Sequence, residues 1–344
     1  MKIEYECSIG SNTRLNERLD VKQLQSAVHT LRDKGTVHFD GLEDRVTARQ
    51  IDEILFARRP DLELAISSAG PPEPLYSDKF LISVSEMKHV KKLQIHCRKR
   101  QDFSIFGKMG QLEQLRLHLT YVPLDISFAG ELPHLKFIII NSKCKGLEHL
   151  ADSTSLVSVF TYSGNVDFTF AANLSIKNVR LTGRHDSWRH ILKPCLKTLA
   201  FDCVPNLNDI DCISDCTGLE KLSIAQSKIT TLPDFSPNKN LRELYIYSAK
   251  NLHNLENLAT IPQLETLSIM EVSSKVNIDR LSSILLAMPN LKTIGCGFMS
   301  LAKKHVLMLK DKLRQGGRED LIGEPNFSIH YDFIDILEAP VILD

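Results

Sequence analysis

The chain carries a recurring pattern of apolar positions whose clearest copies lie between Leu219 and Met270. There the phrase Leu-x-x-Leu-x-Ile occurs three times, starting at Leu219, Leu241 and Leu264, at intervals of 22 and 23 residues. Successive side chains of a strand point to opposite faces, so the alternation at the end of each phrase predicts a short strand with one buried face.

The same phrase runs without a missing member through the greater part of the chain. Its ten first positions are Val90, Leu112, Leu135, Leu156, Ile176, Leu196, Leu219, Leu241, Leu264 and Leu291. Ten parallel strands spaced ~4.8 Å apart would give a sheet roughly 45 Å across. A surface of that length suits a macromolecular partner better than a metabolite.

A fixed period in this range, built on Leu-x-x-Leu-x-Leu, is the signature of the leucine-rich repeat, and the chain resembles that family. The resemblance implies an α/β solenoid, a horseshoe or arc with a parallel β-sheet on its concave face and turns or short helices on its convex face. We expect about ten repeats in residues 90–298, an N-terminal αβ cap in 1–89 whose alternating helices and strands are also what degenerate repeats would give, and a C-terminal helix-strand cap in 299–344.

The flanking regions have their own element signals. Val21, Leu24, Val28 and Leu31 share one helical face, and Thr47 with Gln50 forms a capping box before a second helix. Asp279 is a plausible N-cap for a helix in the longest repeat. The remaining expected elements are strands at 36–39, 62–66 and 326–331 and a helix at 301–313.

One family feature is missing. Leucine-rich repeats place an asparagine three residues after the last strand leucine, where its side chain satisfies buried backbone groups. The corresponding positions here hold Thr120, Lys143, Gly164, Arg184, Ser227 and Ala249. Without an asparagine ladder the turns cannot all be satisfied in the same way, so we expect uneven curvature.

Charge and cysteine content narrow the class of partner. Lysine plus arginine (42) equals aspartate plus glutamate (42), which gives no overall drive toward nucleic acid. No apolar run reaches signal-peptide or membrane-spanning length, so we expect a cytoplasmic protein without a membrane partner. The eight scattered cysteines indicate reduced thiols, and their spacing does not favour zinc; we expect no metal and no cofactor.

The residues interleaved with the buried strand positions would face the concave side. Two apolar clusters stand out there, one of Phe137, Ile139, Phe160 and Tyr162 and one of Tyr245, Tyr247 and Met270, with Arg116, Arg180 and Glu243 as rim charges. Exposed aromatic residues with charged rims match the composition of interface hot spots, so we predict partner binding by these ten residues. The alternative is that a segment covers them or that the middle strands are buried on both faces.

Other candidate sites are weaker. His96 and His118 fall in one column of adjacent strands, which offers too few ligands for a metal. The basic run from Lys88 to Arg100 could meet an acidic partner or nucleic acid, but its alternate residues are needed for the sheet core. No nucleophile, phosphate-loop, zinc-protease or dinucleotide motif is present.

These observations favour a non-enzymatic protein-binding scaffold. The short irregular repeats resemble bacterial intracellular leucine-rich proteins, which suggests an inhibitor or immunity-type protein that neutralises a cognate toxin or enzyme. Two alternatives stay open: an adaptor or host-directed effector, and a metal- or thiol-dependent enzyme that uses His96, His118 and the cysteines. The sequence does not indicate an oligomeric state.

Overall fold

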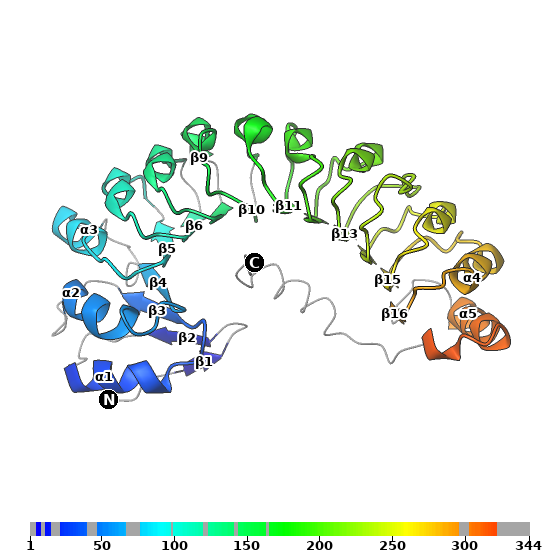
Figure 1. Cartoon of the computed structure of the whole chain (residues 1–344), viewed down its shortest axis with the longest axis horizontal. Coiled ribbons are helices and arrows are strands. Elements are labelled where there is room, and N and C mark those ends of the chain that lie inside the picture. Colours follow the sequence, from blue (N-terminus) through cyan, green and yellow to red (C-terminus); the bar gives the residue numbers. More distant parts are fainter. Residues whose placement is uncertain are drawn as a thin grey trace. The chain divides into compact units, whose positions relative to one another are not determined.

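The structure is a computed structural model, and it describes residues 5–7, 11–14, 21–39, 47–66, 76–97, 99–119, 123–140, 144–162, 165–295 and 303–321. The chain divides into two compact units, Met1–Leu174 and Ser175–Asp344. In each unit the strands line one side and the helices the other (Figure 1). The strand expected at 326–331 lies outside the described residues.

The first unit contains a sheet of eight strands in chain order. They are β1 (Tyr5–Cys7), β2 (Ser11–Arg14), β3 (Thr36–Phe39), β4 (Glu63–Ile66), β5 (Lys92–Cys97), β6 (Gln114–Leu119), β8 (Phe137–Ile140) and β10 (Ser158–Thr161). β1 and β2 are antiparallel, whereas the pairs from β2 to β10 are parallel. A second, two-stranded parallel sheet pairs β7 (Leu124–Asp125) with β9 (Cys144–Lys145).

The helices of this unit are α1 (Val21–Thr30), α2 (Ala48–Ile51), a π-helical turn η1 (Asp52–Phe56), α3 (Asp78–Ser85) and the 3-10 helices η2 (Ser104–Lys108), η3 (Ser127–Glu131), η4 (Leu147–Leu150) and η5 (Phe168–Asn173). In this unit the described helices after α3 are all short 3-10 helices. The capping box of Thr47 and Gln50 is confirmed. Helix α3 was not predicted from the sequence, although Ser77 caps it by accepting the N–H of Phe80.

The second unit repeats the arrangement with six parallel strands in chain order. They are β11 (Asn178–Thr182), β12 (Thr198–Asp202), β13 (Lys221–Ala225), β14 (Glu243–Tyr247), β15 (Thr266–Met270) and β16 (Thr293–Gly295). The helices are η6 (Trp188–Ile191), η7 (Asp211–Asp215), η8 (Glu256–Thr260), α4 (Ile278–Leu286), α5 (Lys303–Gln315) and η9 (Glu319–Leu321). Asn277, not Asp279, caps α4, because its side-chain oxygen reaches the N–H of Arg280.

Ten strands, β5, β6, β8 and β10 through β16, lie where the repeat phrase predicts them. The apolar positions stack in register: Leu199, Leu222, Leu244, Leu267 and Ile294 are successive partners, and all are at most 3% exposed. The 20–23-residue spacing leaves room only for short helices opposite the strands. The buried ladder is therefore the core of each unit.

Side-chain oxygens of aspartate and asparagine accept backbone N–H groups near the short helices. They satisfy backbone groups there, as the asparagine ladder of the family does at its turns. Six side-chain oxygens each accept the N–H of the residue two positions later, at 2.7–3.0 Å; five of these N–H groups lie in the first turn of a short helix, and the sixth, that of Ser236, lies in a turn. The pairs are Asp102–Ser104, Asp125–Ser127 and Asp167–Thr169 in the first unit, and Asp209–Asp211, Asp234–Ser236 and Asn254–Glu256 in the second. Each cap satisfies a donor that the short helix leaves open.

Arg59 fastens α1 to the rest of the first unit. Its guanidinium donates to the carbonyl oxygens of Val28 and Leu31 at 3.1 and 3.0 Å, and to both carboxylate oxygens of Asp61 at 2.8 Å. The Arg59 side chain is only 15% exposed. One side chain thus satisfies carbonyl groups at the C-terminal end of α1 that have no partner within the helix.

Replacing Arg59 by leucine should lower the free energy of unfolding by about 2–4 kcal/mol, because the helix-end carbonyls and Asp61 would lose a buried charged donor. Urea unfolding followed by circular dichroism measures the change. The matched control is Arg49→Leu, which breaks an ion pair between Glu53 and an Arg49 side chain that is 84% exposed, and which should change stability far less than Arg59→Leu. Equal losses in the two variants would contradict the role of Arg59.

The hydrogen bond from Arg59, which outweighs the opposing effect of burial, lowers the pKa of Asp61 from 3.8 to about 2. The ionised form is favoured in the folded protein, so this stabilisation is complete above about pH 4 and is lost as pH falls toward 2. In acid titrations of stability, Asp61→Asn should remove that part of the pH dependence. An unchanged profile between pH 4 and 2 would show that Asp61 does not titrate with folding.

Candidate functional site

The side chains at the third, fifth and seventh positions of each phrase point away from the helices and form what we call the sheet face. In the first unit, Glu63 lies at the centre of a polar network on this face. Its carboxylate accepts the hydroxyl of Thr36 at 3.2 Å and the amide of Gln114 at 3.3 Å, and it lies 3.3 Å from Nε of Arg116. The network joins β3, β4 and β6, and the Glu63 and Arg116 side chains are only 8% and 18% exposed.

The predicted apolar cluster of the first unit is assembled, but it is less exposed than expected. Phe137 packs edge-on against Phe160 with ring centroids 4.7 Å apart, and Ile139 is the register partner of both Arg116 and Phe160. Ile139 is 0% and Phe160 1% exposed, whereas Phe137 and Tyr162 are half-buried. The expectation of exposure is wrong for Ile139 and Phe160. The alternative, that the middle strands are buried on both faces, describes β8 and β10.

In the second unit the predicted rim charges are paired within the chain. Arg180 is 7% exposed and donates to the carboxylate of Asp202 on the neighbouring strand at 2.8 Å. Glu243 lies 2.8 Å from Nζ of Lys221 and accepts the hydroxyl of Tyr245, also at 2.8 Å. Each charge is therefore held in a fixed position on the sheet face.

The second predicted cluster lies on β14 and β15. Tyr245 and Tyr247 stack with ring centroids 6.4 Å apart, and Met270 is the register partner of Tyr247. Both tyrosines are 6% exposed, so they too are more buried than expected, while Met270 is half-buried. Burial raises the pKa of Tyr247 and keeps its hydroxyl protonated.

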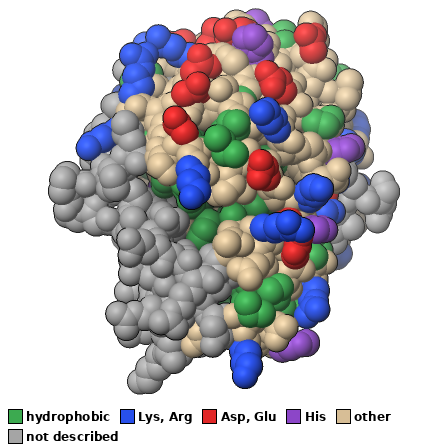
Figure 2. Space-filling view, turned by 90° about the vertical axis from the view of Figure 1, so that its left-hand side faces the viewer, with side chains coloured by type: hydrophobic (Ala, Val, Ile, Leu, Met, Phe, Trp, Pro, Cys, Tyr) green, Lys and Arg blue, Asp and Glu red, His purple; other side chains and the backbone are tan. Residues whose placement is uncertain are grey.

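The basic run from Lys88 to Arg100 does not form one surface. Lys91 pairs with Glu113 at 2.8 Å before the start of β5, and Nζ of Lys92 donates to a backbone carbonyl, with burial lowering its pKa. Arg100 follows the other end of β5 and is exposed. Seen from the side on which α1, α2 and α3 lie, acidic and basic side chains are interspersed (Figure 2). The run therefore places charges at both ends of strand β5.

The histidines and cysteines give little support to metal or thiol chemistry. His96 and His118 are register partners, as predicted, and the His96 ring hydrogen-bonds to Gln94. Within the described ranges no three His, Cys, Asp or Glu side chains are placed to hold a metal ion. Burial raises the pKa of Cys216 to about 12, which disfavours a reactive thiolate.

Among the described side chains, Cys195, Cys203, Cys212 and Cys216 are free thiols. Burial also raises the pKa values of Cys203 and Cys212. Among the helices in the described part of the chain, none combines the length and apolarity needed to cross a bilayer.

Comparison with known proteins gives similarity at the level of solved structures. No family model matches the chain, and no curated protein matches it. An internalin (inlF) from Listeria monocytogenes aligns at 15% identity with a TM-score of 0.48 and covers 89% of this chain and 94% of its own. Internalin C2 (inlC2) from the same organism aligns at 13% identity with a TM-score of 0.36, over 64% and 84% of the two chains.

A plant structure shows a similar degree of likeness. The leucine-rich repeat ectodomain of the membrane receptor kinase GASSHO1/SCHENGEN3 from Arabidopsis thaliana, in complex with CASPARIAN STRIP INTEGRITY FACTOR 2, aligns at 14% identity with a TM-score of 0.43. The match covers 86% of this chain and 39% of that chain.

Replacing Glu63 by leucine should lower the free energy of unfolding by about 2–4 kcal/mol, because Arg116 would be left largely buried without its carboxylate. The control is Glu113→Leu. Glu113 pairs with two lysines, but it is 30% exposed and they are 44% and 40% exposed, so its loss should cost less than about 1 kcal/mol. Chemical denaturation measures the free energy of unfolding of both variants. A smaller loss for Glu63→Leu than for Glu113→Leu would contradict a buried network.

The assignment of the fold comes from the chain's own repeats. Each copy of the phrase is a short strand, its apolar positions form in-register buried ladders, and a short helix opposes nearly every strand. This is the architecture that a 20–23-residue leucine-based period specifies. The chain has the leucine-rich repeat fold, built from short repeats of uneven length.

Proposed function

We propose that the chain is a non-enzymatic scaffold that binds another protein through its sheet face. The observation that carries the proposal is the fixation of charged side chains on that face. Arg180 is held by Asp202, and Lys221 by Glu243, through pairs that join adjacent parallel strands. A partner meets side chains already in place, so little conformational entropy is lost on binding.

Half-buried apolar side chains beside these charges supply candidate anchors. The candidate anchors are Phe137 and Tyr162 in the first unit and Met270 in the second. Aromatic side chains in partly desolvated surroundings dominate binding energy at many protein interfaces, and neighbouring charges set specificity. The buried residues Ile139, Phe160, Tyr245 and Tyr247 then serve as the support on which the anchors rest.

The partner class that fits best is an enzyme or toxin whose active site is covered by a broad surface. Strands contribute side chains to one continuous face in each unit, and a face of this kind suits occlusion better than turnover. On this proposal the protein is an inhibitor or immunity-type protein that acts in the cytoplasm of a bacterium. The resemblance of its short irregular repeats to bacterial intracellular proteins supports that setting.

A pull-down from the native lysate tests sheet-face binding. Phe137→Ala with Tyr162→Ala should reduce capture of a stoichiometric partner by about 30-fold or more, as expected for two anchor residues. The matched control is Val21→Ala with Ile82→Ala, which removes two exposed apolar side chains from α1 and α3. Thermal melts confirm folding; equal capture by both double variants would place the interface elsewhere.

The inhibitor role has its own test. The product of a neighbouring gene, co-expressed with the intact chain, should co-purify with it and lose its enzymatic or toxic activity. The Phe137→Ala, Tyr162→Ala variant should restore that activity at equal concentration. Binding without any loss of activity would contradict inhibition and favour an adaptor.

A further inference from the structure

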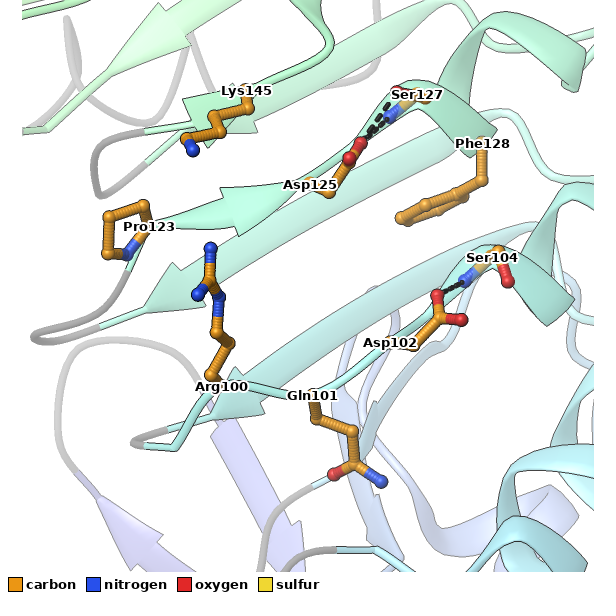
Figure 3. A pocket seen from close by; sticks show the side chains of 9 residues that line it. All are labelled: Arg100, Gln101, Asp102, Ser104, Pro123, Asp125, Ser127, Phe128 and Lys145. Atoms are coloured by element: carbon orange, nitrogen blue, oxygen red, sulfur yellow. Dashed lines mark hydrogen bonds between the residues drawn. The ribbon is translucent and has the colours of Figure 1, made fainter.

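A pocket of about 560 Å³ opens beside β7 in the first unit, away from the sheet face. Its walls come from the segment after β5, from β7 and from β9 (Figure 3). The backbone of Lys145 lies opposite Asp125, but its side chain and that of Arg100 point toward Pro123, whereas Asp102 and Phe128 lie nearer Ser127. The lining residues therefore follow β7 and include both basic and acidic side chains.

The backbone of β7 is open on the pocket side. The N–H of Ile126 donates to the carbonyl of Lys145 on β9 at 2.9 Å. Peptide groups alternate in direction along a strand, so those of Leu124 and Ile126 face β9 and that of Asp125 faces the pocket. Over the described residues, no backbone hydrogen bond joins 100–104 to 123–127.

The second unit shows what closure at the corresponding place looks like. The segments that lead to Asp234 and to the helix cap Asn254 are joined directly: Thr231 bridges Asn254, and the N–H of Leu232 donates to the carbonyl of Asn254 at 3.3 Å. Around β7 the pair with β9 is formed but the pair with the preceding repeat is absent from the described residues. The pocket occupies the position of a missing strand pairing.

The charges lining the pocket indicate what could complete it. Arg100 and Lys145 are exposed, and neither forms an ion pair within the described part of the chain. Asp125 and Asp102 each use one carboxylate oxygen to cap a helix. Asp125 lies opposite Lys145, and the pKa of its carboxyl is lowered by hydrogen bonds from Ser127 and, less strongly, by the charge of Lys145. A compact dianion would meet these carboxylates as well as the two cations, whereas an extended chain can set a single negative group beside Arg100 and Lys145.

We propose that this pocket binds an extended acidic segment of a partner polypeptide. The segment pairs with the open edge of β7 and places a carboxylate between Arg100 and Lys145. Strand addition of this kind draws affinity from backbone hydrogen bonds and specificity from side-chain pockets. The site is separate from the sheet face, so binding at this pocket is tested independently of binding at that face.

Fluorescence anisotropy with labelled peptides tests the proposal on the full chain. The probe is Val-Thr-Glu-Val-Glu-Thr; one control peptide carries glutamine for glutamate, and another carries an N-methyl group on the central valine. The pocket variant is Arg100→Ala with Lys145→Ala. The matched variant, Lys88→Ala with Lys108→Ala, removes the same charge from exposed positions outside this pocket.

The acidic peptide should bind the wild-type chain and should weaken at least about tenfold with the pocket variant but less than about twofold with the matched variant. The N-methyl peptide, which keeps its charges but cannot pair as a strand, should also bind at least about tenfold more weakly. The proposal is overturned by lack of binding to the wild type, by equal loss in both variants, or by equal affinity for either control peptide.

Discussion

The structure depends on one constraint: no repeat of this length can bury its apolar side chains alone. Each strand offers one row of leucine or isoleucine side chains, and the row is covered only when the next repeat stacks in register, as Leu222 does between Leu199 and Leu244. Stability therefore accumulates from nearest-neighbour contacts along the chain. Once register is set, every other repeated position is fixed in space, including those that take no part in the core.

Two further features follow from that register. Aspartates spaced by one or two repeats, Asp102, Asp125, Asp167 and Asp209, each cap a short helix and so satisfy backbone donors that the helix itself leaves open. Oppositely charged side chains also meet across neighbouring strands on the sheet face, as Arg180 meets Asp202. The sheet face is therefore ordered although its side chains take no part in the buried ladders. We assign partner binding to this face.

The sequence predicts the strands well because the period of the buried positions is strict. It predicts the sheet face less well, because alternation shows which way a side chain points but not how much of it remains exposed. Ile139 and Phe160 point as expected and are nevertheless buried. The roles of Asp102 and Asp125 could have been found from their 23-residue spacing, each two residues before a serine. The open edge of β7 could not, since a missing backbone pairing leaves no trace in residue type.

Oxidative footprinting tests the central claim, that a protein partner covers the sheet face, most directly. Hydroxyl radicals modify methionine and tyrosine side chains according to their exposure, and mass spectrometry reads each site in the free chain and in the complex with its captured partner. Met270 and Tyr162 lie on the sheet face, while Met308 on α5 is 42% exposed and serves as the internal reference. We predict protection of Met270 and Tyr162 with Met308 unchanged. Protection of Met308 alone would contradict the account.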